Sequence, residues 1–107
     1  MPLINLEYND SVVSDEEAKE LSNAVRDIVS EVTGIADVFV YANTAKVKVQ
    51  VAPVEIFVRM SASITQEKSG LMKDIKIKLA KWKEENSFTH PINLTLIPMD
   101  WQIEIGI

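Results

Sequence analysis

The stretch PVEIFVRMSASIT, residues 53–65, carries the strongest indication of the fold. A proline opens a run rich in β-branched and aromatic residues, which is typical of a strand, and Thr65, twelve residues later, can cap a helix. The stretch PLINLEYNDSVVS, residues 2–14, has the same layout, because Pro2 opens a strand-forming run and Ser14 stands twelve residues after it. This repeated spacing predicts two similar halves, each beginning with a strand that a helix follows.

The first half has clear signals for both elements. Residues 2–8 predict a strand, and Ser14 begins a helix. Glu17 lies three residues after Ser14, which is the spacing of a capping box. Apolar residues then recur every three or four positions, as on the buried side of a helix, until Gly34, a residue suited to end it.

Two strand signals follow this helix, at Val38–Tyr41 and at Lys46–Val51. In the second segment, valines alternate with Lys and Gln. This pattern predicts a strand with one solvent-exposed (wet) face, near an edge or an interface of the sheet. The run Val54–Ile64 lacks this wet pattern, and we predict that it is a central strand.

The second half continues with a helix that we expect to begin at Thr65. Its apolar face is predicted to consist of Leu71, Met72, Ile75, Leu79 and Trp82. Ile77 lies on the opposite face, where it would meet water or a partner. A last long strand is predicted at Ile92–Pro98, and Trp101–Ile107 forms a short extended tail.

The predicted order is therefore β-α-β followed by β-α-β, an α+β fold of two tandem units. No linker separates the halves, so we expect one domain, 1–107, with pseudo-repeat halves 2–52 and 53–107. Two arrangements share this order. A ferredoxin-like domain interleaves the units in one antiparallel sheet, whereas a duplicated βαβ fold pairs strands in parallel within each unit.

The composition excludes several classes of function. Eleven Lys and Arg against sixteen Asp and Glu give a net charge of −5, which argues against a general nucleic-acid binder. The absence of cysteine excludes disulfides and thiolate chemistry, and with the single histidine, His90, we expect no metal site and no cofactor. Because the chain has no long apolar run and no secretion signal near residue 1, we expect no membrane association and a cytoplasmic location.

Three short segments resemble the tautomerase superfamily. They are Met1-Pro2 ahead of an apolar strand, Val32-Thr33-Gly34-Ile35 at the end of the first helix, and the strand Ile56–Ile64. Within that superfamily the chain is most similar to the long members with two βαβ units, 5-carboxymethyl-2-hydroxymuconate isomerase and macrophage migration inhibitory factor. The resemblance implies helices on one face of the sheet, a homotrimer, and an active site near each subunit interface.

The resemblance also implies chemistry centred on Pro2. After removal of Met1, Pro2 would be a secondary amine, and an apolar site would bring its pKa towards neutrality. Such an amine can act as general base and acid, moving a proton in the keto-enol conversion of a small unsaturated acid. If Met1 is retained, the Pro2 nitrogen is an amide and this reaction cannot run. In the inhibitory-factor branch a lysine follows the Thr-Gly pair, whereas this chain has Ile35 there.

Four further residues are candidates for substrate binding. Arg59 could contact a substrate carboxylate, although an ion pair with Glu55 or another carboxylate across the strands is the alternative. Ser63 and Ile64 stand where the resemblance implies a pocket lined by backbone groups, or they form a plain strand end. Trp101 could wall a pocket or a neighbour's surface, or pack in the core.

Three functional interpretations remain open from the sequence. The first is a trimeric tautomerase that acts on a small organic acid. The second is a non-catalytic, oligomeric binding or structural module of the same fold. The third is an unrelated ferredoxin-like domain that binds a small molecule.

Overall fold

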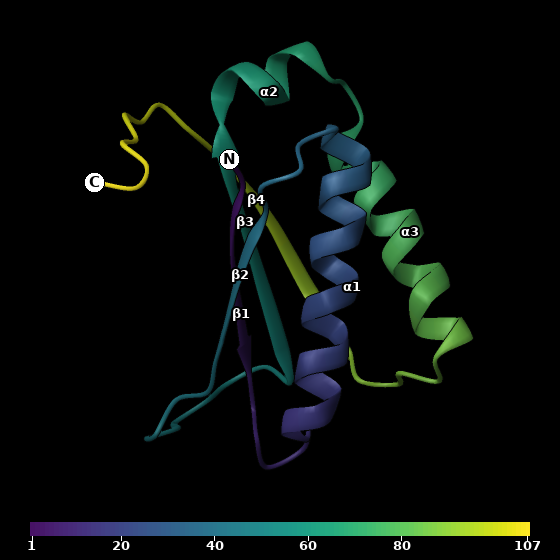
Figure 1. The fold of residues 1–107 in the computed structure, drawn as a ribbon. Helices are drawn as coiled ribbons and strands as arrows, with labels where there is room; N and C mark the ends of the chain where they lie inside the picture. The colour runs from purple at the N-terminus through teal and green to yellow at the C-terminus, as the bar shows by residue number, and fades with distance from the viewer.

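A computed structural model describes all residues of the chain, 1–107. One mixed sheet contains four strands, β1 (Leu3–Tyr8), β2 (Phe39–Asn43), β3 (Val54–Ser61) and β4 (Asn93–Met99). The helices are α1 (Asp15–Thr33), α2 (Ala62–Glu67) and α3 (Leu71–Glu85). Figure 1 shows α1 and α3 together on one face of the sheet, with α2 at one end of it. No helix is both long enough and apolar enough to cross a membrane.

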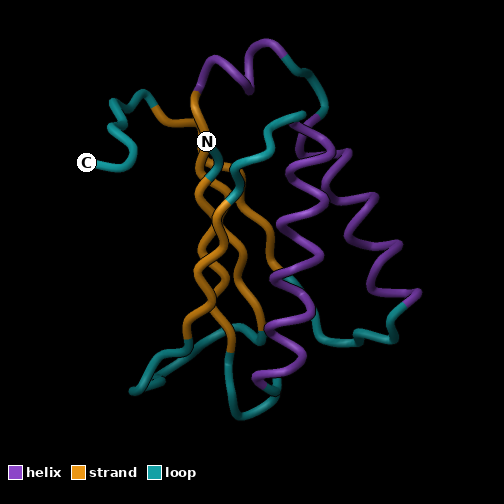
Figure 2. Tube along the Cα trace, in the orientation of Figure 1, coloured by secondary structure: helices purple, strands orange, loops and turns teal.

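The strand order β2-β1-β3-β4 decides between the two predicted arrangements. β1 and β2 are parallel, β3 and β4 are parallel, and the central pair β1 and β3 is antiparallel. Parallel pairing within each half is the arrangement of a duplicated βαβ fold, and it rules out the ferredoxin-like alternative. The predicted α+β class, with helices on one face of the sheet, is confirmed (Figure 2).

The core lies between the sheet and its two long helices. Side chains at alternate positions of the central strands point to the helices and are fully buried; they are Ile4 and Leu6 of β1 and Val54, Ile56, Val58 and Met60 of β3. Leu21, Val25 and Val29 of α1 and Ile75 and Leu79 of α3 complete the same cluster. The intervening positions of the strands form a second face that no helix covers, which we call the open face.

The predicted ends of the first helix are confirmed. The Ser14 hydroxyl oxygen accepts a hydrogen bond from the Glu17 N–H at 3.1 Å, and the Glu17 carboxylate accepts one from the Ser14 N–H at 3.0 Å. At the other end, Gly34 has a φ of 73°, a left-handed conformation that glycine adopts without steric cost. Its N–H donates to the Ser30 carbonyl at 2.8 Å.

The predicted boundary at Ile64 and Thr65 is wrong. β3 ends at Ser61, and Thr65 lies inside the short helix α2 rather than at the start of the long helix, which begins at Leu71 after Gly70. The physical reason is that no neighbouring strand pairs with the residues after Ser61. The pair of Ser61 with Met99 is the last one between β3 and β4. Backbone groups without a neighbouring strand must find partners locally, and a helical turn supplies them.

The predicted strand at Lys46–Val51 is also wrong. This segment is an irregular loop between β2 and β3, with Val47 80% and Val49 98% exposed. Within the single chain no strand pairs with it, so an alternating pattern alone does not produce a strand there.

The remaining boundaries agree closely with prediction. β2 and β4 begin one residue later than predicted and extend slightly further. As predicted, β3 is a central strand, and Ile77 is 56% exposed on the outer side of α3. The tail Trp101–Ile107 has no regular structure and leaves the sheet on the side away from the helices (Figure 1).

Candidate functional site

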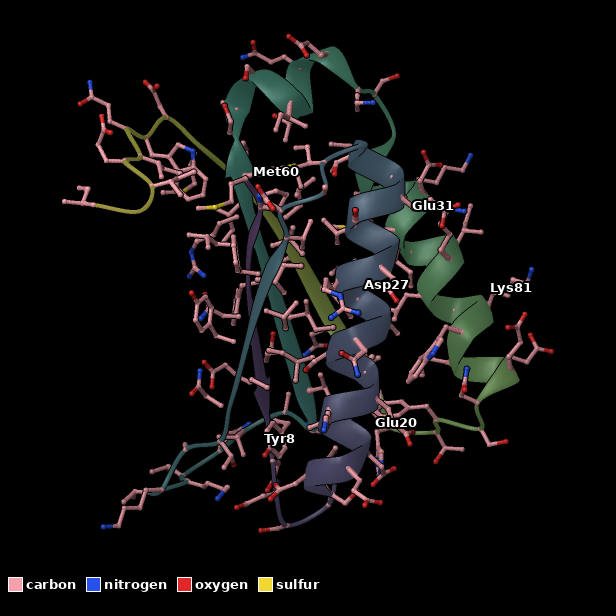
Figure 3. All side chains as sticks on the ribbon, viewed as in Figure 1. Tyr8, Glu20, Asp27, Glu31, Met60 and Lys81 are labelled. Atoms are coloured by element: carbon pink, nitrogen blue, oxygen red, sulfur yellow. The ribbon has the colours of Figure 1, made fainter.

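Pro2 lies at the end of the sheet where β1 begins. Its side chain is less than 2% exposed, and its carbonyl oxygen accepts a hydrogen bond from the Phe39 N–H at 3.2 Å. The pairing of Leu3 with Arg59 places Pro2 level with Met60, which is fully buried. Figure 3 labels Met60 at this end of the sheet and Tyr8 at the other. Pro2 is therefore a shielded residue in apolar surroundings.

The side chains with displaced pKa values lie at the other end of the sheet. A hydrogen bond from the Ser14 backbone N–H lowers the pKa of Glu17, and a hydrogen bond from the Lys48 ammonium lowers the pKa of Asp10. The hydroxyl of Tyr8 donates to Asp15 at 2.7 Å, and this bond raises the pKa of Tyr8. These shifts follow from local capping and ion pairing, and none of them marks the region around Pro2.

Arg59 is on the open face, opposite to the core face that buries the ring of Pro2. Its guanidinium donates a hydrogen bond to the Asn5 side-chain oxygen and lies over the Phe57 ring, 5.8 Å from the ring centroid. The alternative of an ion pair with Glu55 or another carboxylate is wrong, because Arg59 forms no ion pair and Glu55 instead accepts a hydrogen bond from Asn93 at 2.8 Å. A cross-strand amide and an aromatic ring therefore orient Arg59.

The remaining candidates are near the same end of the sheet but on different elements. Ser63 and Ile64 lie in the first turn of α2, so the alternative of a plain strand end is wrong. The hydroxyls of Ser63 and Ser61 are 2.9 Å apart, and Ile64 packs against the core. Trp101 is half-buried just after β4, whose Met99 pairs with Ser61.

These five candidates line none of the three principal hollows on the surface. The first, of about 680 Å³, lies between α1 and α3; Figure 3 labels Glu20, Asp27, Glu31 and Lys81 along it. The second, of about 340 Å³, lies on the open face beside the β2–β3 loop, and the third, of about 140 Å³, lies between α3 and β4. The structure also places no three His, Asp or Glu side chains together as metal ligands.

Asn5 and Phe57 were missed by the sequence reasoning. Asn5 interrupts the apolar run from Leu3 to Leu6, and Phe57 precedes Arg59 by two positions on the same face, so the sequence marked each of them locally. Only the register of β1 on β3, which pairs Asn5 with Phe57, shows that they surround Arg59.

Comparison with solved structures identifies the fold. The macrophage migration inhibitory factor-like protein of Entamoeba histolytica is 21% identical with a TM-score of 0.61, the match covering 96% of this chain and 93% of that one. A fused 4-OT described as an asymmetric trimer is 10% identical with a TM-score of 0.68 and coverages of 94% and 91%. A 5-carboxymethyl-2-hydroxymuconate delta-isomerase is 12% identical with a TM-score of 0.63 and coverages of 99% and 89%.

The fold is that of the tautomerase superfamily. The matches extend over nearly the whole chain, so the tautomerase fold inferred from short motifs is confirmed. No family profile matches the sequence, and no curated protein sequence matches it. At these identities the likeness establishes the architecture, and the chemistry has to be argued from the residues.

Proposed function

We propose that this protein is a tautomerase that moves a proton in the keto-enol conversion of a small unsaturated acid, with Pro2 as general base and acid. The observation that carries the proposal is the burial of Pro2 immediately before the central strand β1 of a tautomerase fold. Removal of Met1 turns the Pro2 nitrogen into a secondary amine. Burial in an apolar region disfavours its ammonium form, which keeps the amine available as a base near neutral pH.

In this proposal Pro2 takes a proton from the enol oxygen or an adjacent carbon and returns one at the other position. Arg59 binds the substrate carboxylate, since a guanidinium offers paired donors to such a group. Arg59 lies on the open face of the sheet and Pro2 on the core face. In this proposal the substrate therefore binds around the end of the sheet, where it can reach both residues. Ser63, Ile64 and Trp101 at that end would form the wall, completed by a second copy in a homotrimer.

The first test is the intact mass of the protein, which reports whether Met1 is absent. The processed protein is then assayed for ketonisation of phenylenolpyruvate. Pro2→Ala should lower the rate by roughly 10²- to 10⁴-fold, the usual contribution of a general base. Pro91→Ala, which changes an exposed loop proline, is the matched control and should retain the rate.

Arg59→Ala tests the binding role separately. It should mainly raise KM, because a carboxylate contact made equally in the ground state and the transition state does not change kcat. Arg26→Ala is the control, since Arg26 is exposed on α1 and pairs only with Asp27. A processed wild type without activity above buffer on several enols would contradict the catalytic proposal.

Two observations favour a second candidate, a non-catalytic oligomeric module of the same fold. Pro2 lines none of the three principal hollows, and Ile35 replaces the cation that the inhibitory-factor branch has after its Thr-Gly pair. Retention of Met1 in cells would support this candidate over the enzyme, because the Pro2 nitrogen would then be an amide without basicity.

A further inference from the structure

Arg59 is a cation that no carboxylate of its own chain neutralises. It forms no ion pair, whereas the other arginine of the chain, Arg26, pairs with Asp27 at 3.1 Å. The nearest glutamate on its own strand, Glu55, is four residues away, roughly 13 Å at strand spacing. The charge of Arg59 therefore remains available to a carboxylate that does not belong to this chain.

Two neutral side chains hold the guanidinium in place. Leu3 pairs with Arg59, and Asn5 is the next residue of β1 on the same face, within reach of a long side chain. The Asn5 side-chain oxygen accepts a hydrogen bond from Nη1 of Arg59. The guanidinium also lies over the Phe57 ring, 5.8 Å from the ring centroid. Because neither partner carries a negative charge, both orient the arginine without neutralising it.

These contacts leave most of the guanidinium without a partner. An arginine has five N–H donors in a planar fork, and the hydrogen bond to Asn5 uses one donor on Nη1. The Nε and Nη2 groups make no hydrogen bond within the chain. Paired N–H groups on one edge of a guanidinium match the two oxygens of a carboxylate. The free edge of Arg59 therefore suits a carboxylate better than a neutral carbonyl group.

Arg59 lies close to the end of the sheet at which Pro2 lies. Its partner on β1 is Leu3, the residue directly after Pro2. In the homotrimer proposed for this fold the open face turns inward, so less water is left to screen the charge of Arg59. A bound carboxylate offsets that charge. Asn5 and Phe57 act only through Arg59, so they need no contact with the substrate.

We propose that Asn5 and Phe57 are positioning residues that keep Arg59 oriented and unneutralised, and thereby make the site selective for substrates with a carboxylate. The inference rests on the proposed function, in which Arg59 binds the substrate carboxylate. It adds that the neutral amide at position 5 determines this selectivity. An aspartate at the same position would form an ion pair with Arg59 and close the arginine to the substrate.

Asn5→Asp tests this inference, because aspartate has nearly the same shape, accepts the same hydrogen bond and adds a negative charge. It should raise KM for phenylenolpyruvate by at least roughly tenfold with little change in kcat. A merely structural role of Asn5 predicts no such loss, because the contact with Arg59 is kept. In the Arg59→Ala background Asn5→Asp should have no further effect, since the two residues act as one unit.

Two further variants complete the comparison. Phe57→Leu keeps an apolar side chain but removes the attraction of the ring for the cation, and it should raise KM by about two- to fivefold. Should Asn5→Asp fail to fold, Phe57→Leu carries the same test. Asn23→Asp, which adds the same charge on the exposed side of α1, is the matched control and should behave like the wild type.

A binding measurement separates this inference from the proposed function. Hydrocinnamate carries a carboxylate but no enol, so its binding to the full-length protein, followed by calorimetry, needs no turnover. Asn5→Asp should weaken this binding by at least roughly tenfold. Urea unfolding should show that the variant is no less stable than the wild type, because the new ion pair replaces a hydrogen bond.

The outcomes fall on different claims. Hydrocinnamate binding that Asn5→Asp weakens, in a processed protein without tautomerase activity, would contradict the proposed function and support the positioning of Arg59. Unchanged KM and unchanged hydrocinnamate binding in Asn5→Asp would overturn the inference and leave the proposed function standing. A wild type that does not bind hydrocinnamate, including because a neighbouring copy supplies a carboxylate to Arg59, would also overturn the inference.

Discussion

Glu17, in the first turn of α1, contacts two separate parts of the chain through its carboxylate. One carboxylate oxygen accepts the Ser14 N–H, and the other lies 2.9 Å from the His90 ring nitrogen, in the segment before β4. The His90 ring packs edge-on against Phe88, at 5.2 Å between ring centroids, and Phe88 is buried in the core. One side chain therefore caps a helix and ties it to the second half of the chain.

We expect this arrangement to make stability depend on pH at acidic values. The Ser14 hydrogen bond, with a smaller contribution from His90, lowers the pKa of Glu17 in the folded protein. A lowered pKa contributes stability above the unfolded value, and this is lost as the pH falls through the folded value. Glu17→Gln should therefore destabilise the protein at about pH 6, and the difference should shrink towards about pH 3.

Urea unfolding of the wild type and Glu17→Gln at several pH values measures this effect. Glu16→Gln is the control, because Glu16 lies in the same first turn but makes no side-chain hydrogen bond. A difference between wild type and Glu17→Gln that stays constant across this range would contradict the prediction.

At the scale of the element, the end of α1 depends on the backbone conformation of Gly34. Its φ of 73° is unfavourable for a residue with a Cβ atom, although nothing lies closer than the Lys68 ammonium, 4.0 Å from a built Cβ. The cost of substitution therefore comes from backbone strain rather than from a clash. Gly34→Ala should lower the free energy of unfolding by about 1 kcal/mol.

Thermal and urea unfolding check this prediction, and Gly34→Asn supplies the comparison. Asparagine tolerates the left-handed region better than alanine, so it should lose less stability. Equal losses for the two variants would show that strain is not the cause.

Amide hydrogen exchange distinguishes the central strand from the loop that precedes it. β3 is paired on both sides, with β1 and β4, and its core-facing side chains are fully buried. Residues 46–51 pair with no strand. We therefore expect the amides of Val54–Ser61 to exchange much more slowly than those of residues 46–51. Faster exchange in β3 would contradict the placement of this strand.

The whole molecule leaves many apolar side chains exposed for a chain of this size. Phe39 and Tyr41 on β2 are 44% and 55% exposed. Val49 and Ile107 are almost fully exposed, and Ile105 is 72% exposed. Exposed strand edges and apolar segments of this kind are usually covered by a partner. We propose that copies of this chain cover them in a homotrimer.

Light scattering at micromolar concentration tests this proposal. A trimer should give three times the chain mass of 12.0 kDa. Replacing exposed Val47 and Val49 by serine should shift the mass towards the monomer, whereas Ser substitution of Val12, exposed near the start of α1, serves as the control. A wild-type mass of one chain would contradict the trimer.

The sequence by itself determined the local features and the class of fold. Ser14, Glu17 and Gly34 specify the ends of α1 through side-chain hydrogen bonds and a left-handed backbone, both of which depend on neighbouring residues. The matching runs after Pro2 and Pro53 predicted the two halves, and the Thr-Gly-Ile segment supported a resemblance whose implied fold is confirmed.

Only the tertiary structure decided which strands pair, and hence which residues meet. Periodicity is a property of one segment, whereas pairing needs a second backbone to satisfy hydrogen bonds. Residues 46–51 alternate like a strand but find no partner, and 62–64 read as strand but close into α2 because the sheet ends at Ser61. The contacts of Arg59 with Asn5 and Phe57, and the pairing of Glu7 with Glu55, likewise follow from the register of β1 on β3, which no single segment of sequence specifies.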